Sequence, residues 1–372
     1  MQGWKTYELK ELVSLSKEKY NPKKETENLP CIELEHIEGE TGRLLGHTNS
    51  LDQGSIKNRF KPGNVLYGKL RPYLRKFYFP NFEGVCSSEI WVLHNNEEKI
   101  HNKYLYYLVQ TNRFNENANK STGTKMPRAD WSFMSEIIFP IPPLNEQQKI
   151  ASILSTWDKA IELKEKLIEQ KKEQKKGLMQ KLLTGEVRLP GFDGEWKKVK
   201  LAKVVRKTKG KAVEYIEGGK FPAIDMDYLE SGTFKNYSND ATVFAEKNDV
   251  LLLWDGSRAG MAFTGVEGAV GSTFVKLECK SIHNIFLQKH FEMNEQRIQR
   301  LREGSGIPHV PKDFLDYYKV KMPSMEEQKA IAYVLNNMDR DLELLWKEVA
   351  YLKEQKQGLI QLLLTGKVRV QV

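Results

Sequence analysis

Apolar residues recur at alternating steps of four and three residues along two long stretches of the chain. In the second stretch this pattern runs from Ile331 to Leu363, and only Lys356 interrupts it with a charge. The first stretch starts at Ile150 and follows the same pattern, with three lysines in its middle. A heptad pattern is typical of helices that pack along a partner helix, and lysine stems can lie along the same apolar seam. We therefore predict two long helices whose seams need partners.

Each predicted helix is long enough to act as a rod. About 38 residues at ~1.5 Å per residue give a length of roughly 57 Å. Two such rods packed on each other would hold the segments that they carry at a fixed distance. The predicted coiled-coil packing positions are Ile150, Leu154, Trp157, Ile161, Ile168, Leu178 and Leu182 in the first helix and Ile331, Leu335, Met338, Leu342, Leu345, Val349, Leu352, Leu359 and Leu363 in the second.

The two stretches are copies of one sequence. Ile150 aligns with Ile331, at a distance of 331 − 150 = 181 residues, and Leu-Leu-Thr-Gly at 182–185 aligns with 363–366 at the same distance. No gap is needed between these points. Each copy follows a proline and ends near a glycine, which can adopt the left-handed conformation that stops a helix. The chain is therefore an internal repeat, and its fold should be one unit used twice.

The segments that precede the two helices are also related. Trp4 aligns with Trp196 at an offset of 192 and Pro127 with Pro308 at an offset of 181, so the first segment is longer by 192 − 181 = 11 residues. Both segments contain β-rich runs broken by glycine and proline and followed by a helix. The predicted strands cover 65–67, 76–79 and 90–93, with a helix near 103–112, in the first segment, and 250–254, 262–264 and 273–277, with a helix across 285–302, in the second.

These elements predict an α+β fold. Two similar globular α/β domains would be joined by two long helices that form an antiparallel coiled coil with pseudo-two-fold symmetry. In such an arrangement the two chain termini lie close together. The predicted boundaries are 1–143 for the first domain, 144–185 for the first long helix, 186–195 for a linker, 196–323 for the second domain, 324–366 for the second long helix and 367–372 for a C-terminal tail.

The net charge of the chain indicates which kind of partner it can bind. The sequence has 58 lysines and arginines against 49 aspartates and glutamates, a formal net charge of +9. An excess of this size suggests a polyanionic partner such as nucleic acid, although a merely soluble basic protein has the same charge. The apolar runs are too short to span a membrane, and the N-terminal segment lacks the apolar core of a signal peptide. We therefore expect a cytoplasmic protein.

Catalytic and metal-binding motifs are weak in this sequence. Residues 63–69 have the spacing of a phosphate-binding P-loop, but Leu70 stands where serine or threonine would bind magnesium. Asp255, Glu278 and Lys280 resemble the carboxylate and lysine arrangement of metal-dependent nucleases, which remains an alternative function. The three scattered cysteines, at positions 31, 86 and 279, have no metal-ligand spacing. We predict a protein that is not an enzyme and binds no metal; a coiled-coil scaffold that binds proteins rather than DNA is the second alternative.

One segment has the composition of a DNA-binding loop. Residues 68–76, Gly-Lys-Leu-Arg-Pro-Tyr-Leu-Arg-Lys, place four cations and an aromatic ring after a predicted strand. Arginine binds guanine bidentately and lysine binds phosphates. A solvated hairpin with Leu70 and Leu74 buried explains the same residues equally well. The candidate DNA-binding residues are Tyr67, Lys69, Arg71, Tyr73, Arg75, Lys76, Lys125 and Arg128 in the first segment and Ser257, Arg258, His309 and Lys312 in the second.

Several motifs in this chain match one known family. They are Ile-Pro-Pro-Leu-Asn-Glu-Gln at 141–147, Met-Pro-Ser-Met-Glu-Glu-Gln at 322–328, the two Leu-Leu-Thr-Gly helix ends, Gly-Glu-Trp at 194–196 and Leu-Tyr-Gly-Lys-Leu-Arg-Pro-Tyr at 66–73. With these motifs the chain resembles the specificity (S) subunit of type I restriction–modification systems. The resemblance covers nearly the whole chain.

The resemblance implies a function in DNA recognition. The two domains would be target-recognition domains, each binding one half of a split DNA sequence, and the coiled coil would set the spacing between the halves. Two modification (methyltransferase) subunits that carry S-adenosylmethionine would dock on the chain, and restriction subunits that use ATP and Mg²⁺ are an optional addition. The chain itself would bind double-stranded DNA, no cofactor and no membrane, and would carry out no catalysis.

Overall fold

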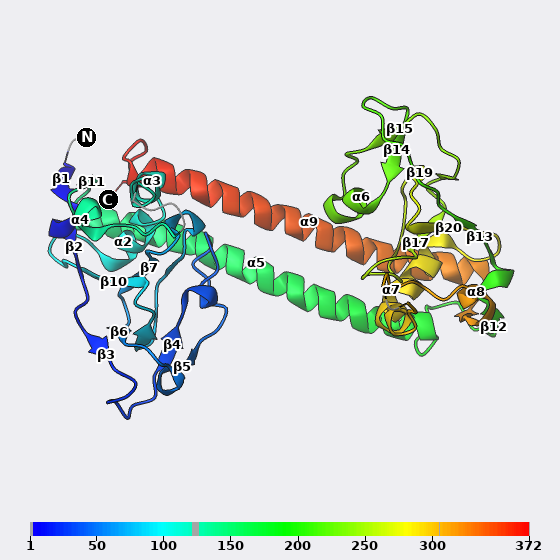
Figure 1. Cartoon of the computed structure of the whole chain (residues 1–372), viewed down its shortest axis with the longest axis horizontal. Coiled ribbons are helices and arrows are strands. Elements are labelled where there is room, and N and C mark those ends of the chain that lie inside the picture. Colours follow the sequence, from blue (N-terminus) through cyan, green and yellow to red (C-terminus); the bar gives the residue numbers. More distant parts are fainter. Residues whose placement is uncertain (1–2, 121–125, 305, 372) are drawn as a thin grey trace. The chain divides into compact units, whose positions relative to one another are not determined.

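The computed structural model of the chain describes residues 3–120, 126–304 and 306–371. They divide into two compact units (Figure 1). Unit 1 consists of Met1–Glu165 and Glu348–Val372, and unit 2 consists of Lys166–Lys347. The two long helices, α5 (Leu144–Thr184) and α9 (Met325–Leu364), each contribute one end to unit 1 and the other end to unit 2. The sequence-based boundaries separate these helices from the globular domains, whereas in the structure each helix end is part of a domain core.

Unit 1 is built on an antiparallel sheet with the strand order β2-β10-β7-β8. Alternate residues of β7 face opposite sides, so that Val65 and Tyr67 join the core formed with the helices while Leu66 joins a second core beneath the sheet. A five-stranded sheet, β3-β6-β9-β4-β5, covers that second core, and β1 pairs with β11. The strands are β1 (Lys5–Glu8), β2 (Val13–Leu15), β3 (Lys19–Tyr20), β4 (Pro30–Ile32), β5 (Thr48–Asn49), β6 (Lys57–Phe60), β7 (Val65–Gly68), β8 (Phe77–Tyr78), β9 (Gly84–Cys86), β10 (Ile90–Asn95) and β11 (Ile138–Ile141), and the short helices are α1 (Leu9–Leu12), α2 (Asn102–Leu108), α3 (Asn112–Ala118) and α4 (Trp131–Ser135).

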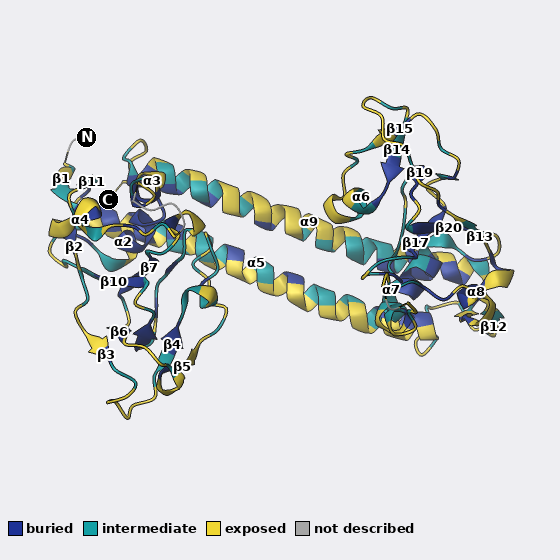
Figure 2. Ribbon diagram, viewed as in Figure 1, coloured by how far each residue is buried: buried dark blue, intermediate teal, exposed yellow. Residues whose placement is uncertain are grey.

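Unit 2 repeats this plan. Its central sheet has the order β13-β20-β17-β18, and β17, like β7, is buried along its whole length (Figure 2). A parallel pair, β14 with β19, corresponds to the parallel pair β4 with β9. The strands are β12 (Lys197–Lys200), β13 (Val205–Lys209), β14 (Phe221–Ile224), β15 (Tyr237–Ser238), β16 (Phe244–Ala245), β17 (Val250–Leu253), β18 (Ala262–Thr264), β19 (Gly268–Val270), β20 (Phe274–Cys279) and β21 (Lys319–Met322), and the shorter helices are α6 (Met226–Ser231), α7 (Asn284–Arg300) and α8 (Phe314–Tyr317).

The predicted helix near 103–112 is in fact two helices. The first helix ends before Thr111, which is the N-cap of α3. Its hydroxyl oxygen accepts a hydrogen bond from the backbone N–H of Phe114 at 3.3 Å. A side chain that satisfies an otherwise unpaired N–H in this way favours a new helix start. The second sheet of each unit was not predicted either, because several of its strands have only two residues.

Within unit 1, the ends of α5 and α9 pack antiparallel. Ile150 and Leu154 of α5 share one core with Ile360 and Leu363 of α9. Further along, the carboxylate of Asp158 lies 2.5 Å from the buried ammonium group of Lys356. The residue number falls along α9 as it rises along α5, which defines the antiparallel direction. Every residue assigned to the seam from sequence is buried or half-buried.

Unit 2 contains the same ion pair at the equivalent place. Lys175 of α5 lies 2.5 Å from Asp339 of α9. Asp339 follows Asp158 by 339 − 158 = 181 residues, and Lys356 follows Lys175 by 356 − 175 = 181, so the two pairs are copies. Two of the lysines that interrupt the apolar seams, Lys175 and Lys356, therefore form ion pairs between the two helices. The sequence pattern did not identify the two aspartates, which lie outside the heptad register.

A second repeated contact holds the start of each long helix. The nearly fully buried carboxylate of Glu146 accepts two hydrogen bonds from Arg369, at 2.6 and 2.7 Å, and the guanidinium lies over the Trp4 ring. In unit 2, Arg188 makes the equivalent bonds to Glu327, at 2.6 and 2.7 Å, and lies over Trp196. The C-terminal segment thus returns to the N-terminal segment, as expected.

The ion pair in unit 1 generates a stability prediction. Asp158→Ala leaves the buried Lys356 ammonium group unpaired and removes the acceptor of the Tyr107 hydroxyl, 2.6 Å away, so we expect a loss of about 3 kcal/mol in the free energy of unfolding. Lys356→Met leaves only a partly exposed carboxylate that water can reach, and should cost less than half as much. Urea unfolding followed by circular dichroism measures both. The exposed pair of Glu343 with Lys347 is the control, because water solvates both charges and Glu343→Ala should leave the free energy of unfolding essentially unchanged. Equal losses for the two buried-pair variants would contradict the prediction.

Candidate nucleic-acid interface

The basic loop of unit 1 has an unusual backbone. It leaves β7 and forms a 3-10 turn over Pro72–Leu74, and the residue on each side of that turn is left-handed: Arg71 has φ 52° and Arg75 has φ 46°. This conformation costs roughly 1–2 kcal/mol for a residue with a side chain, which is why glycine usually occupies it. Two arginines held in a disfavoured conformation within five residues point to a function for their side chains.

Hydrogen bonds hold this loop against a second segment. The backbone N–H of Arg71 donates to Pro127 O at 2.8 Å, and the N–H of Ala129 donates to Lys69 O at 2.8 Å. The backbone of the loop is therefore held in place, while Arg71, Tyr73 and Leu74 are exposed. Tyr73 is 54% exposed and Leu74 is 41% exposed. The alternative of a hairpin that buries Leu74 is wrong.

Several residues of the first segment are already engaged. Tyr67 is fully buried and its hydroxyl donates to Asn115 Oδ1 at 3.0 Å, so it belongs to the core and not to the interface. The half-buried Lys76 donates to Leu34 O at 2.7 Å. Arg128 forms a bidentate pair with Glu89, at 3.0 and 3.1 Å, and this carboxylate raises the pKa of the guanidinium. Lys125 lies outside the described residues. Lys69, Arg71, Tyr73 and Arg75 remain as the candidate interface of unit 1, where the guanidinium of Arg75 makes one long hydrogen bond, 3.5 Å, to Asn112 Oδ1.

Unit 2 has the same backbone arrangement with different side chains. The N–H of Gly256 donates to Pro308 O at 2.8 Å, and the N–H of Val310 donates to Trp254 O at 2.9 Å, matching the two bonds of unit 1. Ser257 is exposed, and the half-exposed Arg258 lies 3.9 Å from the carboxylate of Glu230. His309 forms the bridge with Asp255 that Arg128 forms with Leu70, and Lys312 is exposed on the same segment.

A basic edge strand beside this loop was missed from the sequence. β13 is the edge of its sheet and carries Arg206, Lys207 and Lys209. The ammonium group of Lys207 lies 4.0 Å from the centroid of the Trp254 ring, and burial lowers the pKa of this lysine. The signal was available, since the run 203–211 contains five lysines and arginines. In unit 1 the equivalent strand β2 has no basic residue.

The proposed nuclease site does not form. Phe274 of β20 pairs with Leu253, and Glu278 lies four residues further along, about 13 Å away at ~3.3 Å per residue. Asp255 continues past Leu253 in the opposite direction, so the two carboxylates are too far apart to bind one magnesium ion. Asp255 instead lies 2.5 Å from Lys209, and Glu278 lies 2.6 Å from Arg206. Lys280 is therefore no part of a metal site.

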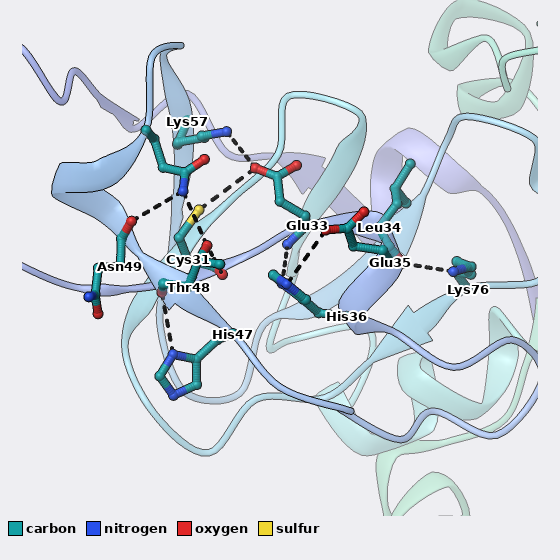
Figure 3. A network of polar contacts seen from close by, with 11 residues as sticks. Cys31, Glu33, Leu34, Glu35, His36, His47, Thr48, Asn49, Lys57 and Lys76 are labelled. Atoms are coloured by element: carbon teal, nitrogen blue, oxygen red, sulfur yellow. Dashed lines mark hydrogen bonds and ion pairs between the residues drawn. The ribbon is translucent and has the colours of Figure 1, made fainter. Parts of the chain in front are cut away.

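The second sheet of unit 1 contains a network of polar contacts that stabilises the fold (Figure 3). Lys57 is buried and lies 2.5 Å from the Glu33 carboxylate, toward which the Cys31 thiol also points at 3.8 Å. Burial raises the pKa of this thiol to about 11. Across the described parts of the chain, His, Cys, Asp and Glu residues nowhere form a group of three or more that could hold a metal ion. The described helices likewise include none that is long and apolar enough to cross a membrane.

The sequence is similar to a known family and to known relatives. The family model for the type I restriction modification DNA specificity domain matches residues 1–172 and 193–353. The MjaVIII specificity subunit of a type I restriction enzyme from Methanocaldococcus jannaschii is 32% identical over 179 residues, which span 46% of this chain and 42% of that protein. A protein described as the MjaX specificity subunit, from the same organism, is 25% identical over 406 residues, 99% of this chain and 94% of that protein.

Solved structures share the fold. The S subunit of a type I restriction–modification system from M. genitalium has a TM-score of 0.62 at 18% identity, over 97% of this chain and 96% of that one. A chain from a study of type I R-M system assembly has a TM-score of 0.67 at 19% identity, over 99% of both chains. The HsdS subunit from Thermoanaerobacter tengcongensis has a TM-score of 0.52 at 20% identity, over 99% of this chain and 98% of that one. The predicted fold class, two similar α/β domains with two long helices, is confirmed.

The left-handed arginines generate a prediction that needs no ligand. Glycine adopts a positive φ without strain, so Arg75→Gly should leave the free energy of unfolding unchanged or raise it by up to about 1 kcal/mol. Leu74→Gly, one residue earlier where φ is negative, should lower it by about 1 kcal/mol. Urea unfolding of both variants makes the comparison. A clear loss for Arg75→Gly would mean that the arginine side chain stabilises the fold.

Proposed function

This chain belongs to the family of type I restriction modification DNA specificity domains, and we propose that it selects the DNA site of a type I restriction–modification complex by binding two half-sites, one with each unit. It is the non-catalytic specificity subunit of that complex. Its partners are double-stranded DNA and the other subunits of the restriction–modification system.

One observation supports the assignment of a separate half-site to each unit. The loops after β7 and β17 have the same backbone hydrogen bonds, to Pro127 and to Pro308, yet carry different side chains. The loop of unit 1 carries Lys69, Arg71, Tyr73 and Arg75, whereas the loop of unit 2 carries Gly256, Ser257 and Arg258 after the buried Trp254. A common backbone positions each loop on the duplex, and the different donors select different bases. Two unlike half-sites follow from this arrangement.

Phosphate contacts would position the protein on DNA. In unit 2 the exposed Lys207, Lys209 and Lys312 surround the loop after β17, with Lys207 stacked on Trp254. Lysine contacts to phosphates are independent of sequence and weaken as the salt concentration rises. Arg71, Arg75 and Arg258 are the candidates for base contacts, because guanidinium groups bind guanine bidentately.

The composition of the complex is also a proposal. Two modification subunits would bind the chain and supply S-adenosylmethionine, and restriction subunits would supply ATP hydrolysis with Mg²⁺. The chain itself would bind none of these cofactors. Such a complex acts on chromosomal or invading DNA, so we place it in the cytoplasm.

The decisive test is sequencing of DNA methylation in cells that express this chain with its modification subunit. We expect one split motif, with two short specified halves and an unspecified gap. Arg71→Ala with Arg75→Ala should relax only one half, since each lost bidentate contact removes about 1–3 kcal/mol of base discrimination. Arg258→Ala should relax the other half, and the exposed Arg340→Ala on α9 is the control that should leave the motif unchanged. Methylation without any split motif would contradict the proposal.

The helix pair should determine the gap. Adding one heptad to α5 after Glu165 and one to α9 after Lys347 keeps the apolar register and lengthens the pair by about 10 Å. This length corresponds to about three base pairs. The methylated motif should keep both halves and gain about three unspecified base pairs. Altered halves with an unchanged gap would show that the helices do not set the spacing.

A further inference from the structure

Each unit exposes one large apolar side chain beside its candidate interface. Ile307 is 71% exposed, the highest value of any large apolar residue in the described ranges, and Met126 is 49% exposed. The two residues are equivalent in the repeat, since 307 − 126 = 181. Single exposed apolar residues are common and need no explanation. Other exposed apolar residues recur at the same offset, Leu163 with Leu344 and Val187 with Val368, but they lie on the long helices or just after them. Met126 and Ile307 differ from these pairs because both lie beside a candidate interface.

Both residues are next in sequence to a proline that is hydrogen-bonded to the loop that we assign to DNA. Met126 precedes Pro127, whose carbonyl accepts from the Arg71 N–H, and Ile307 precedes Pro308, whose carbonyl accepts from the Gly256 N–H. A residue before proline is restricted mainly to extended conformations, so the backbone of Met126 and of Ile307 has limited freedom. The exposed apolar group is therefore one residue from the contact that joins the two segments of each interface.

The segments around these residues are polar, and their charge differs between the two units. In unit 1 the backbones of Lys69 and Arg71 are hydrogen-bonded to Ala129 and Pro127, and the residue after Pro127 is Arg128. In unit 2, His309 follows Pro308 and pairs through its backbone with Asp255 and Glu303. The basic residues of the two interfaces, Lys69 and Arg71 in unit 1 and Arg258 and Lys312 in unit 2, attract a polyanion. An exposed apolar side chain beside them can be accommodated between the stacked bases of DNA.

We propose that Met126 and Ile307 are apolar wedges, each of which enters a base step of the half-site bound by its own unit and unstacks it. Proteins that bend DNA insert methionine, isoleucine and similar side chains between bases in this way. Methylation of a base requires that the base leave the stack, and a step that is already unstacked lowers the energy for that movement. This inference rests on the proposed function, because it needs each unit to bind DNA.

The test uses the complete complex of this chain with its modification subunit, bound to duplexes that carry 2-aminopurine at successive positions of each half-site other than the methylated adenine. The fluorescence of this base rises when it unstacks. We expect a several-fold rise at one step in each half-site. Met126→Ala should abolish the rise in one half-site only, and Ile307→Ala in the other only, with affinity reduced by no more than about tenfold.

Matched variants separate a wedge from other roles. Met126→Leu and Ile307→Leu keep an apolar group and should restore the rise, while Leu344→Ala, 59% exposed on α9, should change nothing. Specific binding by the unmodified complex without any rise, or a rise that persists in both alanine variants, overturns the wedge. Loss of the modification subunit from the alanine variants would assign these residues to a protein contact instead and also overturns it. If the unmodified complex binds no specific DNA, the proposed function has failed, independently of the wedge.

Discussion

The pairing of a buried lysine with an aspartate across the two long helices is the constraint on which the architecture depends. An apolar heptad seam alone tolerates a shift by one heptad, because leucine meets leucine again. A buried ammonium group resists such a shift, because carboxylates beside it offset the cost of removing its charge from water: Asp158 for Lys356, and both Asp339 and Glu292 for Lys175. Lys356 meets Asp158 in unit 1 and Lys175 meets Asp339 in unit 2. Each unit therefore accepts the two helix ends in one register, and it is the same register in both.

The repeat also explains how one chain can vary its recognition surface without losing its fold. The contacts that recur residue by residue are buried at the helix starts: Glu146 with Arg369, and Glu327 with Arg188. They join the beginning of each long helix to a segment distant in sequence and leave the outer loops free. Unit 1 has a fifth strand in its second sheet, and its basic loop replaces a loop of Asp, Gly, Ser and Arg in unit 2. Differences between the units are concentrated where they do not disturb the buried contacts.

The long elements could be predicted from sequence and the local ones could not. The heptad pattern and the constant offset of 181 identify both helices and the repeat because they extend over about forty residues. Strands of two residues, such as β3 and β5, carry no periodic signal and form only because neighbouring strands exist. Tyr67 was predicted to bind DNA with the basic loop, but it is a residue of β7 whose side chain is buried in the core. The basic run at 203–211 is visible in the sequence, but its position beside the loop after β17 is not, because the contact of Lys207 with Trp254 joins residues distant in sequence.

The comparison of Arg71 with Gly256 separates what the fold needs from what the function needs. Both residues occupy the same position in the backbone arrangement and both have a positive φ, 52° for Arg71 and 113° for Gly256. Unit 2 shows that glycine satisfies this turn without a side-chain clash. Unit 1 keeps an arginine there, and a second one at Arg75, although each costs roughly 1–2 kcal/mol in backbone energy. The backbone alone gives no reason for that cost. A guanidinium group presented at a defined angle to DNA does, because bidentate base recognition depends on the geometry that the strained backbone supplies.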